Sequence, residues 1–416
     1  MRLAESLSTF AILFQENQSM EHLSDRIKNM AESATLAMAA KAREFKENGI
    51  DVISLSLGEP DFKTPKHIQE GAKEAIDSEK YFAYPPVNGY ADLRQAIAEK
   101  FKNENGLNYT ADQIVVSNGA KQSIVNVMMA LVNPGDEVIV LSPYWVSYTA
   151  AIELAEGTPV LVKGGIENDF KATAEQVKAA LTDKTKAIIF SSPCNPTGSV
   201  FTEEELSAIA DVLRDTSVIV ISDEIYEHIN FSGAHASIGA LPGMLDQTVT
   251  INGMAKGFAM TGWRVGYIGA PTWIAKACSK IQGQVTSANC SIAQRATLTA
   301  LTSDLGPTKA MTEQYGKRRE LVFGLLNDIP GVKTNMPEGA FYFFPDVSSY
   351  FGKSNGTNTI KNASDLCLYL LENAHVSLVT GEAFGDPDCI RLSYAASEEN
   401  LKEALKRVKE TLAKLS

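Results

Sequence analysis

The chain is poor in the residues that build disulfide frameworks and metal sites. Its 416 residues include only five cysteines and five histidines. No two cysteines stand in a C-x-x-C spacing and no two histidines in an H-x-x-x-H spacing, so the sequence indicates neither a disulfide framework nor a metal site. Scattered cysteines in odd number are typical of a reducing compartment, and we expect a cytoplasmic protein.

The chain also lacks a long hydrophobic run and an excess of positive charge. No apolar stretch reaches the roughly 20 residues of a membrane-spanning helix, so we expect no membrane partner. There are 50 acidic residues against 38 basic ones, and the formal net charge of −12 argues against nucleic acid as a partner. With 44% hydrophobic and 21% charged residues, the composition is that of a globular protein, and a chain of this length usually divides into two domains.

The first 19 residues differ from the rest of the chain. Their one apolar run, residues 9–14, is only six residues long and is preceded by a single arginine and by Glu5. That run is too short and too poorly flanked for a secretory signal. We expect residues 1–19 to be an N-terminal extension that is disordered or dispensable.

Apolar segments of strand length alternate with amphipathic segments of helix length, such as residues 202–213. The expected buried parallel strands are residues 137–141, 186–190, 217–221 and 249–251. This alternation predicts an α/β fold in which helices cover both faces of the sheet. The later stretch, with the apolar residues 340–344 and a closing helix at 398–415, predicts a smaller α+β domain.

One lysine and one arginine stand eight residues apart in an otherwise uncharged segment, residues 252–264. Desolvation among small and apolar residues lowers the pKa of Lys256 and leaves a free amine, the nucleophile that forms a Schiff base with an aldehyde. Arg264 keeps its charge and offers a planar fork of donors that matches a phosphate. An aldehyde that carries a phosphate describes pyridoxal 5′-phosphate. Taken alone, such cations are more typical of surface residues whose charged ends reach water.

Two further segments place polar residues at the ends of expected strands. Asp223 follows the strand at 217–221, where its carboxylate could pair with a pyridinium nitrogen, and Tyr226 could hydrogen-bond the phenolate oxygen of the same ring. Asn195 follows the strand at 186–190 and offers an amide donor to that oxygen and to a substrate carboxylate. By themselves, Asp223 is also typical of a helix N-cap and Asn-Pro-Thr-Gly of a plain turn.

In order and approximate spacing, a series of motifs resembles those of the fold-type I pyridoxal-phosphate enzymes, and within them the class I aminotransferases of the aspartate aminotransferase family. The resemblance covers nearly the whole chain from about Met20 onward. The motifs are LGEPDF (57–62), YPPVNG (84–89), NGAKQ (118–122), SPYW (142–145), NPTG (195–198), DEIY (223–226), Lys256 with Arg264, and RLS (391–393).

The resemblance implies the architecture of a fold-type I pyridoxal-phosphate-dependent transferase. In such a fold, a large domain with a mainly parallel sheet covered by helices binds the cofactor, and here it would comprise residues 67–310. A smaller α+β domain would combine residues 20–66 with residues 311–416. The large domain would then be an insertion between the two halves of the small one.

The resemblance also implies how the cofactor, pyridoxal 5′-phosphate, is bound. Lys256 would form the Schiff base, Asp223 would pair with the ring nitrogen, and Asn195 and Tyr226 would hydrogen-bond the phenolate oxygen. Arg264 would bind the phosphate.

Further cofactor contacts follow from the same resemblance. The turn formed by Gly119, Ala120 and Lys121 precedes an expected helix, whose first N–H groups would bind the phosphate. Trp145 would stack on the ring and face the substrate, although a lone tryptophan is more often a core residue. Tyr84 would reach the phosphate of the neighbouring subunit, which makes the expected assembly a homodimer with shared active sites.

The sequence departs from the family at one position. Many members carry a hydroxyl residue three positions before the lysine as an extra phosphate donor, whereas this chain has Gly253. A nearby hydroxyl such as that of Ser123 could compensate.

Substrate recognition is implied for four positions. Arg391 would bind the α-carboxylate as a bidentate partner, and the backbone of Gly58 would approach the substrate. Thr35 belongs to a segment that would close over the substrate. Lys121 would pair with a distal carboxylate, or it would be a solvated lysine beside the phosphate.

The implied activity is transamination, in which an L-amino acid, expected to be L-aspartate, donates its amino group to 2-oxoglutarate. An aromatic or prephenate aminotransferase and a cysteine-type β-lyase remain open, because they share the catalytic residues. Ala31 and Glu32, just before the closing segment, supply no extra cation for prephenate. An aminotransferase-like transcriptional regulator would need a basic module ahead of Gly58, and residues 1–52 are too few and too mixed in charge.

Overall fold

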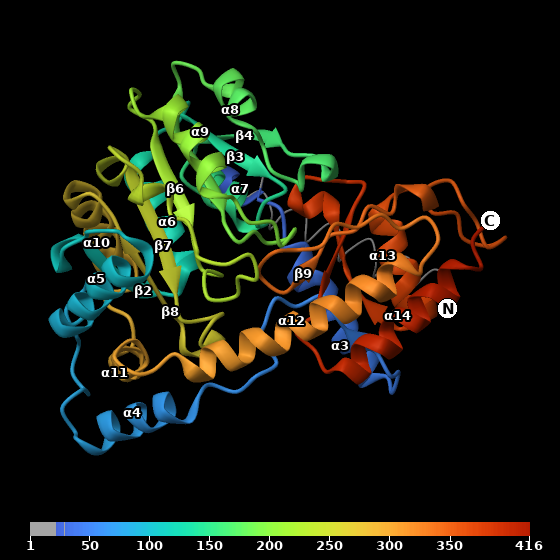
Figure 1. Cartoon of the computed structure of the whole chain (residues 1–416), viewed down its shortest axis with the longest axis horizontal. Coiled ribbons are helices and arrows are strands. Elements are labelled where there is room, and N and C mark those ends of the chain that lie inside the picture. The colour runs from blue at the N-terminus through green and yellow to red at the C-terminus, as the bar shows by residue number, and fades with distance from the viewer. Residues whose placement is uncertain (1–21, 29) are drawn as a thin grey trace.

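The computed structural model describes residues 22–28 and 30–416. The predicted extension at residues 1–19 lies outside this range. The elements form two groups that lie side by side, and the long helix α12 (Gly306–Asn327) runs from one group to the other (Figure 1). In the part of the chain that is described, no helix has the length and hydrophobicity needed to cross a membrane.

A seven-stranded sheet forms the centre of the larger group. Its strand order is β2-β8-β7-β6-β5-β3-β4, and neighbouring strands are parallel except where β8 pairs with β2 and β7. The prediction of a mainly parallel sheet is confirmed, while the antiparallel β8 was not anticipated. The strands are β2 (Ile114–Asn118), β3 (Glu137–Ser142), β4 (Thr158–Lys163), β5 (Thr185–Ser191), β6 (Ile219–Asp223), β7 (Thr248–Gly253) and β8 (Val265–Gly269).

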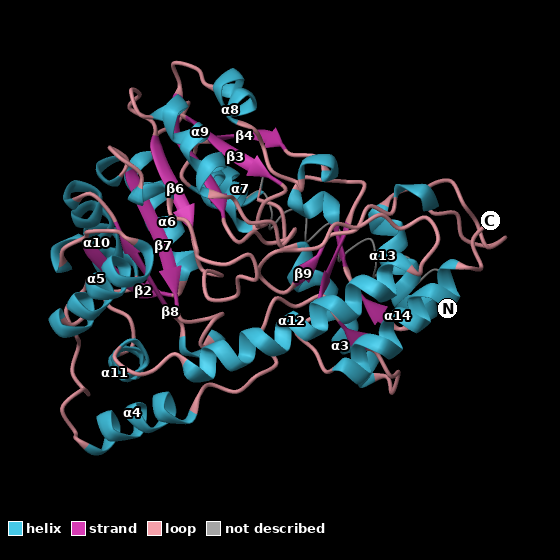
Figure 2. Ribbon diagram, viewed as in Figure 1, coloured by secondary structure: helices cyan, strands magenta, loops and turns pink. Residues whose placement is uncertain are grey.

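Helices surround this sheet, as the cyan ribbons around the magenta strands show (Figure 2). They are α4 (Lys66–Asp77), α5 (Ala91–Asn105), α6 (Ala120–Leu131), α7 (Ser147–Leu154), α8 (Ala174–Ala180), α9 (Glu203–Leu213), α10 (Thr272–Val285) and α11 (Ser291–Leu301). The predicted helix at 202–213 corresponds to α9, whose N-cap Thr202 accepts a hydrogen bond from the backbone N–H of Glu205.

The two faces of the sheet have separate apolar cores. Ile139 of β3 packs in one core, which includes Ile209 of α9, whereas its neighbour Val140 packs in another, which includes Val127 of α6. Successive side chains of a strand point to opposite faces, so a strand that is buried on both sides reads as a continuous β-branched run. The burial of both faces therefore explains why these strands could be read from the sequence.

The smaller group joins the two ends of the chain. Strand β1 (Ile53–Ser54) pairs in parallel with β10 (Val376–Ser377), and β9 (Tyr342–Phe343), β11 (Val379–Thr380) and β12 (Ile390–Ser393) form a second sheet in the order β11-β12-β9. Its helices are α2 (Asp25–Lys28), α3 (Ala34–Glu47), α13 (Ala363–Ala374) and α14 (Glu398–Leu412). The apolar residues 340–344 contain the two residues of β9, and the predicted closing helix ends three residues early, at Leu412.

The predicted domain limits stay predictions. The first limit, between residues 66 and 67, falls at the start of α4, and the second, between residues 310 and 311, falls inside α12. Helix α12 belongs to both groups. Its first turns lie with the larger group, and its later turns pack in the core of the smaller group through Val322 and Leu326.

Candidate active site

A cavity of about 330 Å³ lies at the carboxyl ends of β5 and β6, where it is bordered by both groups of elements. Ligands of open α/β sheets bind at this edge, beyond the ends of the parallel strands. The cavity brings together every predicted site residue except Gly119 and Tyr84. The predicted residues that line it are Thr35, Gly58, Ala120, Lys121, Trp145, Asn195, Asp223, Tyr226, Lys256, Arg264 and Arg391.

Lys256 lies in the turn after β7, with its amine inside the cavity. Nζ donates a hydrogen bond to the carbonyl oxygen of Gly58. Burial lowers the pKa of Lys256 to about 8, and the positive charges of Arg391 and Arg264 act in the same direction. A substantial fraction of this amine is therefore unprotonated just above neutral pH.

Asp223 is the last residue of β6 and its side chain is buried. Its Oδ2 accepts a hydrogen bond of 2.7 Å from the hydroxyl of Tyr148, and its Oδ1 accepts one of 3.2 Å from the backbone N–H of Ile225. Burial raises the pKa of Asp223 to about 6, although both hydrogen bonds oppose the shift. The carboxylate is thus mostly ionised at pH 7 and can accept a proton-bearing ring nitrogen as a partner.

Arg391 of β12 is a buried cation, with only 2% of its surface exposed. Its Nη1 donates to Oδ1 of Asn195 at 3.0 Å and its Nη2 to the carbonyl oxygen of Ser56 at 2.5 Å. Nε finds no partner among the described residues. The guanidinium lies 4.7 Å from the ring centroids of both Tyr342 and Phe384. A positive charge held between two rings, with a donor to spare, suits a carboxylate ligand.

The start of α6 and the side chain of Arg264 lie close together, an arrangement that suits an anion. Gly119 has a φ of +83° at the N-cap of α6, and a Cβ there would lie 2.4 Å from Nη2 of Arg264. A Cβ on Gly266 of β8 would lie 2.1 Å from the backbone nitrogen of Ala120. These two glycines let the guanidinium and β8 approach the helix start, where the first N–H groups have no partner within the helix.

The close approach of β8 explains why a glycine stands at position 253, where the resemblance leads one to expect a hydroxyl residue. A Cβ at this position would lie 2.8 Å from the carbonyl oxygen of Val265 and 2.9 Å from Cα of Gly266. A side chain at 253 would therefore need β8 to shift. The buried Oγ of Ser123 has no partner among the described residues, and Ser123 does not line the cavity. Its compensating role stays a prediction.

Three other predicted residues lie at the cavity wall. Nζ of Lys121 is 5.0 Å from the ring centroid of Trp145, and burial lowers the pKa of Lys121, with Arg264 adding to the shift. Thr35 belongs to α3, and its buried Oγ1 has no partner among the described residues. In contrast, Tyr84 is 95% exposed and does not line the cavity of its own chain.

Two tyrosines of the cavity were not anticipated from the sequence. Tyr148 follows Trp145 by three residues. In a helix that starts near Trp145, this spacing puts both side chains on the same face, so the role of Tyr148 could have been predicted from the sequence. Tyr342 comes from β9, more than a hundred residues away from Tyr226, and the two hydroxyls lie 2.6 Å apart. No local pattern in the sequence indicates that pair.

The residues of the cavity fit pyridoxal 5′-phosphate. The glycine-lined helix start with Arg264 matches the phosphate, the ionised Asp223 matches the ring nitrogen, and Lys256 supplies a partly neutral amine for the aldehyde. The spare donor of Arg391 remains for a carboxylate that arrives with the substrate.

Comparison with known proteins supports the same family. The profile described as aminotransferase class I and II matches residues 50–408. A protein of Petunia hybrida named bifunctional aspartate aminotransferase and glutamate/aspartate-prephenate aminotransferase is 46% identical over 396 residues, which cover 94% of this chain and 82% of the relative.

Two solved structures have the same fold as this chain. The aspartate aminotransferase from Rhizobium meliloti gives a TM-score of 0.92 at 41% identity and covers 95% of this chain and 100% of its own. The aspartate aminotransferase from Thermus thermophilus with maleate gives a TM-score of 0.88 at 42% identity and covers 94% of this chain and 99% of its own.

The lowered pKa of Lys256 predicts how its reactivity depends on pH. In the cofactor-free protein, reductive methylation of Lys256 should follow the fraction of neutral amine and rise with pH, with a midpoint at about 8. An ordinary lysine has its midpoint near about 10.4. Mass spectrometry of the peptide that contains Lys256 measures the rate, with exposed lysines of the same digest as the control. A midpoint equal to theirs would contradict the shift.

Proposed function

Because the chain belongs to the class I and II aminotransferases, a family of pyridoxal-phosphate enzymes, we propose that it moves the amino group of L-aspartate to 2-oxoglutarate. The observation that carries the proposal is the cavity itself. It unites an amine of lowered pKa, a buried carboxylate and a buried arginine with a spare donor. The relatives named above act on aspartate according to their names, and two of their structures share this fold.

Pyridoxal phosphate, when bound, supplies an aldehyde that condenses with amines and a ring that accepts the electron pair left on a carbon when its proton departs. Lys256 would hold it covalently, and Asn195 and Tyr226 would hydrogen-bond its phenolate oxygen. Arg264, Gly119, Ala120 and the backbone of Lys121 would hold its phosphate, and Trp145 would cover its ring. Asp223, ionised at neutral pH, would keep the ring nitrogen protonated.

Proton transfer would be the task of the Lys256 amine. A free amine with a pKa of about 8 can remove the α-proton of the substrate and later return it, because a general base works best when its pKa lies near the working pH. The carbonyl of Gly58, which accepts a hydrogen bond from Nζ, orients the amine inside the cavity.

Substrate binding would depend on two cations that line the cavity. Arg391 would bind the α-carboxylate, and its contacts with Asn195 and Ser56 fix the plane of the guanidinium. Lys121 would bind the distal carboxylate that aspartate and 2-oxoglutarate both have. The Thermus thermophilus structure contains maleate, itself a dicarboxylate. Thr35 and α3 would close over the bound substrate.

We propose a homodimer, and the position of Tyr84 supports it. Its side chain is almost fully exposed and lies outside the cavity of its own chain, which suits a residue that reaches the phosphate site of a second subunit. Each active site would then need both chains. The cytoplasmic location also stays a prediction.

Prephenate is a second candidate acceptor, because the Petunia hybrida relative is named for activity on both aspartate and prephenate. Ala31 and Glu32, just before α3, add no cation for it. The same catalytic residues would serve either acceptor, so the two activities differ only in the side chains that meet the distal part of the substrate.

Replacement of Lys256 tests the proposed chemistry. Lys256→Ala should lower turnover by more than about 10³-fold, since the variant lacks both the covalent anchor and the general base. It should still bind some pyridoxal phosphate through the phosphate and ring contacts. Steady-state transamination of aspartate measures the first effect and equilibrium dialysis the second. Appreciable turnover by the variant would refute the role of Lys256.

Replacement of Lys121 tests how the enzyme selects dicarboxylates. Lys121→Met should lower kcat/KM for aspartate by about 10-fold or more, because a charge-assisted hydrogen bond is lost. The values for alanine and phenylalanine should change by less than about threefold, since neither has a distal carboxylate to lose. Lys121→Arg, which keeps the charge, is the matched control. Equal losses on aspartate and alanine would rule out the distal-carboxylate role.

A further inference from the structure

A buried network of charged side chains lies behind the turn that carries two residues of the cavity. In residues 223–228, Asp223 and Tyr226 line the cavity, whereas Glu224 and Glu227 do not. The side chains of Glu224 and Glu227 are only 1% and 4% exposed. Buried carboxylates need charged or hydrogen-bonded partners, so this turn depends on what the two glutamates contact.

Glu227 is held by the end of α5. Nζ of Lys100 donates to Oε1 of Glu227, and it also donates to Oδ1 of Asn105 at 2.7 Å. Nδ2 of Asn105 donates to Oε2 of Glu227 at 2.6 Å. Burial raises the pKa of Glu227, but the charge of Lys100 and of nearby histidines outweighs it and brings the value to about 2. The carboxyl group of Glu227 is therefore ionised at neutral pH.

Glu224 is held by the same asparagine and by three further donors. Its Oε2 accepts hydrogen bonds from Asn105 at 3.1 Å, from Ser237 at 2.6 Å and from Nε2 of His235 at 2.9 Å. Its Oε1 accepts one from Ser222 at 3.0 Å. Asn105 thus joins the two glutamates, and α5 is fixed to both ends of the turn.

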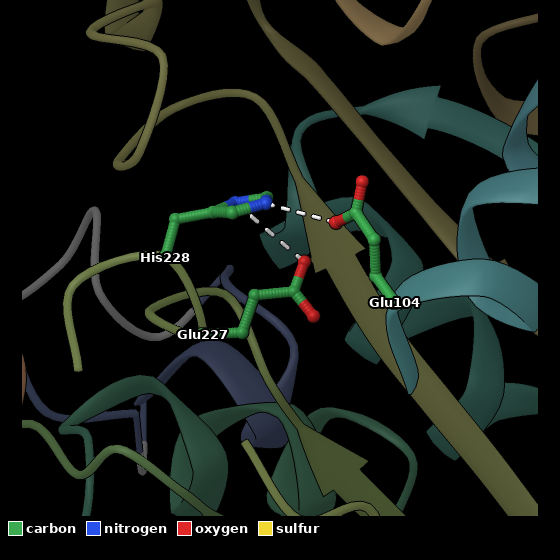
Figure 3. A group of neighbouring side chains, drawn as sticks. All are labelled: Glu104, Glu227 and His228. Atoms are coloured by element: carbon green, nitrogen blue, oxygen red, sulfur yellow. Dashed lines mark hydrogen bonds and ion pairs between the residues drawn. The ribbon is translucent and has the colours of Figure 1, made fainter. Parts of the chain in front are cut away.

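The outer part of the network reaches the segment of Lys256. His228 lies between the carboxylates of Glu104 and Glu227, with Nε2 3.0 Å from the first and Nδ1 3.7 Å from the second (Figure 3). A Cβ on Gly257 would lie 2.8 Å from Cβ of His228, so the histidine packs on the residue that follows Lys256.

The same donors could in principle ligate a metal ion. Glu104, Glu227 and His228 each offer a ligand atom within 4.8 Å of the others. However, the ammonium of Lys100 already lies against Glu227 and 3.7 Å from Glu104, where it supplies the positive charge that two carboxylates require. The prediction of no metal site stays a prediction.

We propose that Lys100 and Asn105 are positioning residues of the cofactor site, which set the places of Asp223 and Tyr226 by holding Glu227 and Glu224 on the other side of the turn. The inference rests on the proposed roles of Asp223 and Tyr226 in cofactor binding. Removal of one member of the buried pair leaves the other charge without its closest partner, and the turn must then shift to let water reach it. A shift of the turn moves the carboxylate and the hydroxyl that face the cofactor.

A double-mutant cycle on the holoenzyme tests this proposal. Lys100→Met and Glu227→Gln each remove one member of the closest buried ion pair and should raise the Kd for pyridoxal phosphate by at least about tenfold. The double variant lacks both members, and its Kd should return to within about threefold of the wild-type value. Ultrafiltration of the holoenzyme at several dilutions gives Kd. The pH at which the absorbance of the bound cofactor changes gives a second readout, because that pH depends on the groups that contact the ring, Asp223 and Tyr226 among them.

Arg407→Met is the control for a general loss of stability. Arg407 pairs with Asp51 at 2.8 Å and with Glu403 at 2.8 Å, and none of the three lines the cavity. This variant should leave both the Kd and the pH midpoint of the absorbance unchanged, even if it melts at a lower temperature.

Three results would overturn the proposal. In the first, the single variants melt at a lower temperature but bind the cofactor as tightly as wild type, with the same absorbance midpoint. The network would then only stabilise the fold. In the second, the losses of affinity add in the double variant, which would show that the change in side-chain volume and not the loss of charge weakens cofactor binding.

The third result concerns Asn105→Ser, which serves if a single variant does not fold. It keeps the ion pair of Lys100 and Glu227 but removes the amide that joins both glutamates, so it should still weaken cofactor binding. Unchanged affinity in this variant would overturn the proposal. A wild-type protein that binds no cofactor would instead refute the proposed function.

Discussion

Three charged groups are held around one cavity, and each needs partners because charge is costly to withdraw from water. Lys256, Asp223 and Arg391 all lie in an environment of low polarity, which shifts the pKa of the first to about 8 and that of the second to about 6. Each buried group has partners supplied by segments far away in the chain, such as Gly58 for Lys256, Tyr148 for Asp223 and Ser56 for Arg391. The site can therefore form only when both groups of elements are in place.

The sheet explains how distant segments reach one cavity. Asp223 ends β6, and residues that follow β5 and β7 supply Asn195 and Lys256, so three neighbouring parallel strands deliver their side chains to the same edge. The smaller group adds Arg391 from β12. Because β1 and β10 pair, the residues before the large sheet and those after it are fixed to each other. The arginine thereby faces the lysine across the cavity.

The sequence predicts those parts of the molecule that depend on local patterns. Strands buried on both faces have continuous β-branched runs, and the polar residues that follow them identify Asp223 and Asn195. The role of Tyr342 could not be predicted, because its contact with Tyr226 joins segments with no shared pattern. The need for a glycine at position 253 could not be predicted either, since it depends on the antiparallel pairing of β7 and β8. Lys100 and Asn105 look like ordinary residues at the end of a helix until α5 is placed against the turn at 223–228.

We propose that this cavity exchanges amino groups through pyridoxal phosphate with aspartate as the favoured donor. The decisive experiment follows the absorbance of the holoenzyme after aspartate, glutamate, phenylalanine or cysteine is added separately, without any oxo acid. We expect the band of the aldehyde form to give way to that of pyridoxamine phosphate, and fastest with aspartate. A band that every amino acid leaves unchanged, or a purified protein with no cofactor band, would contradict it.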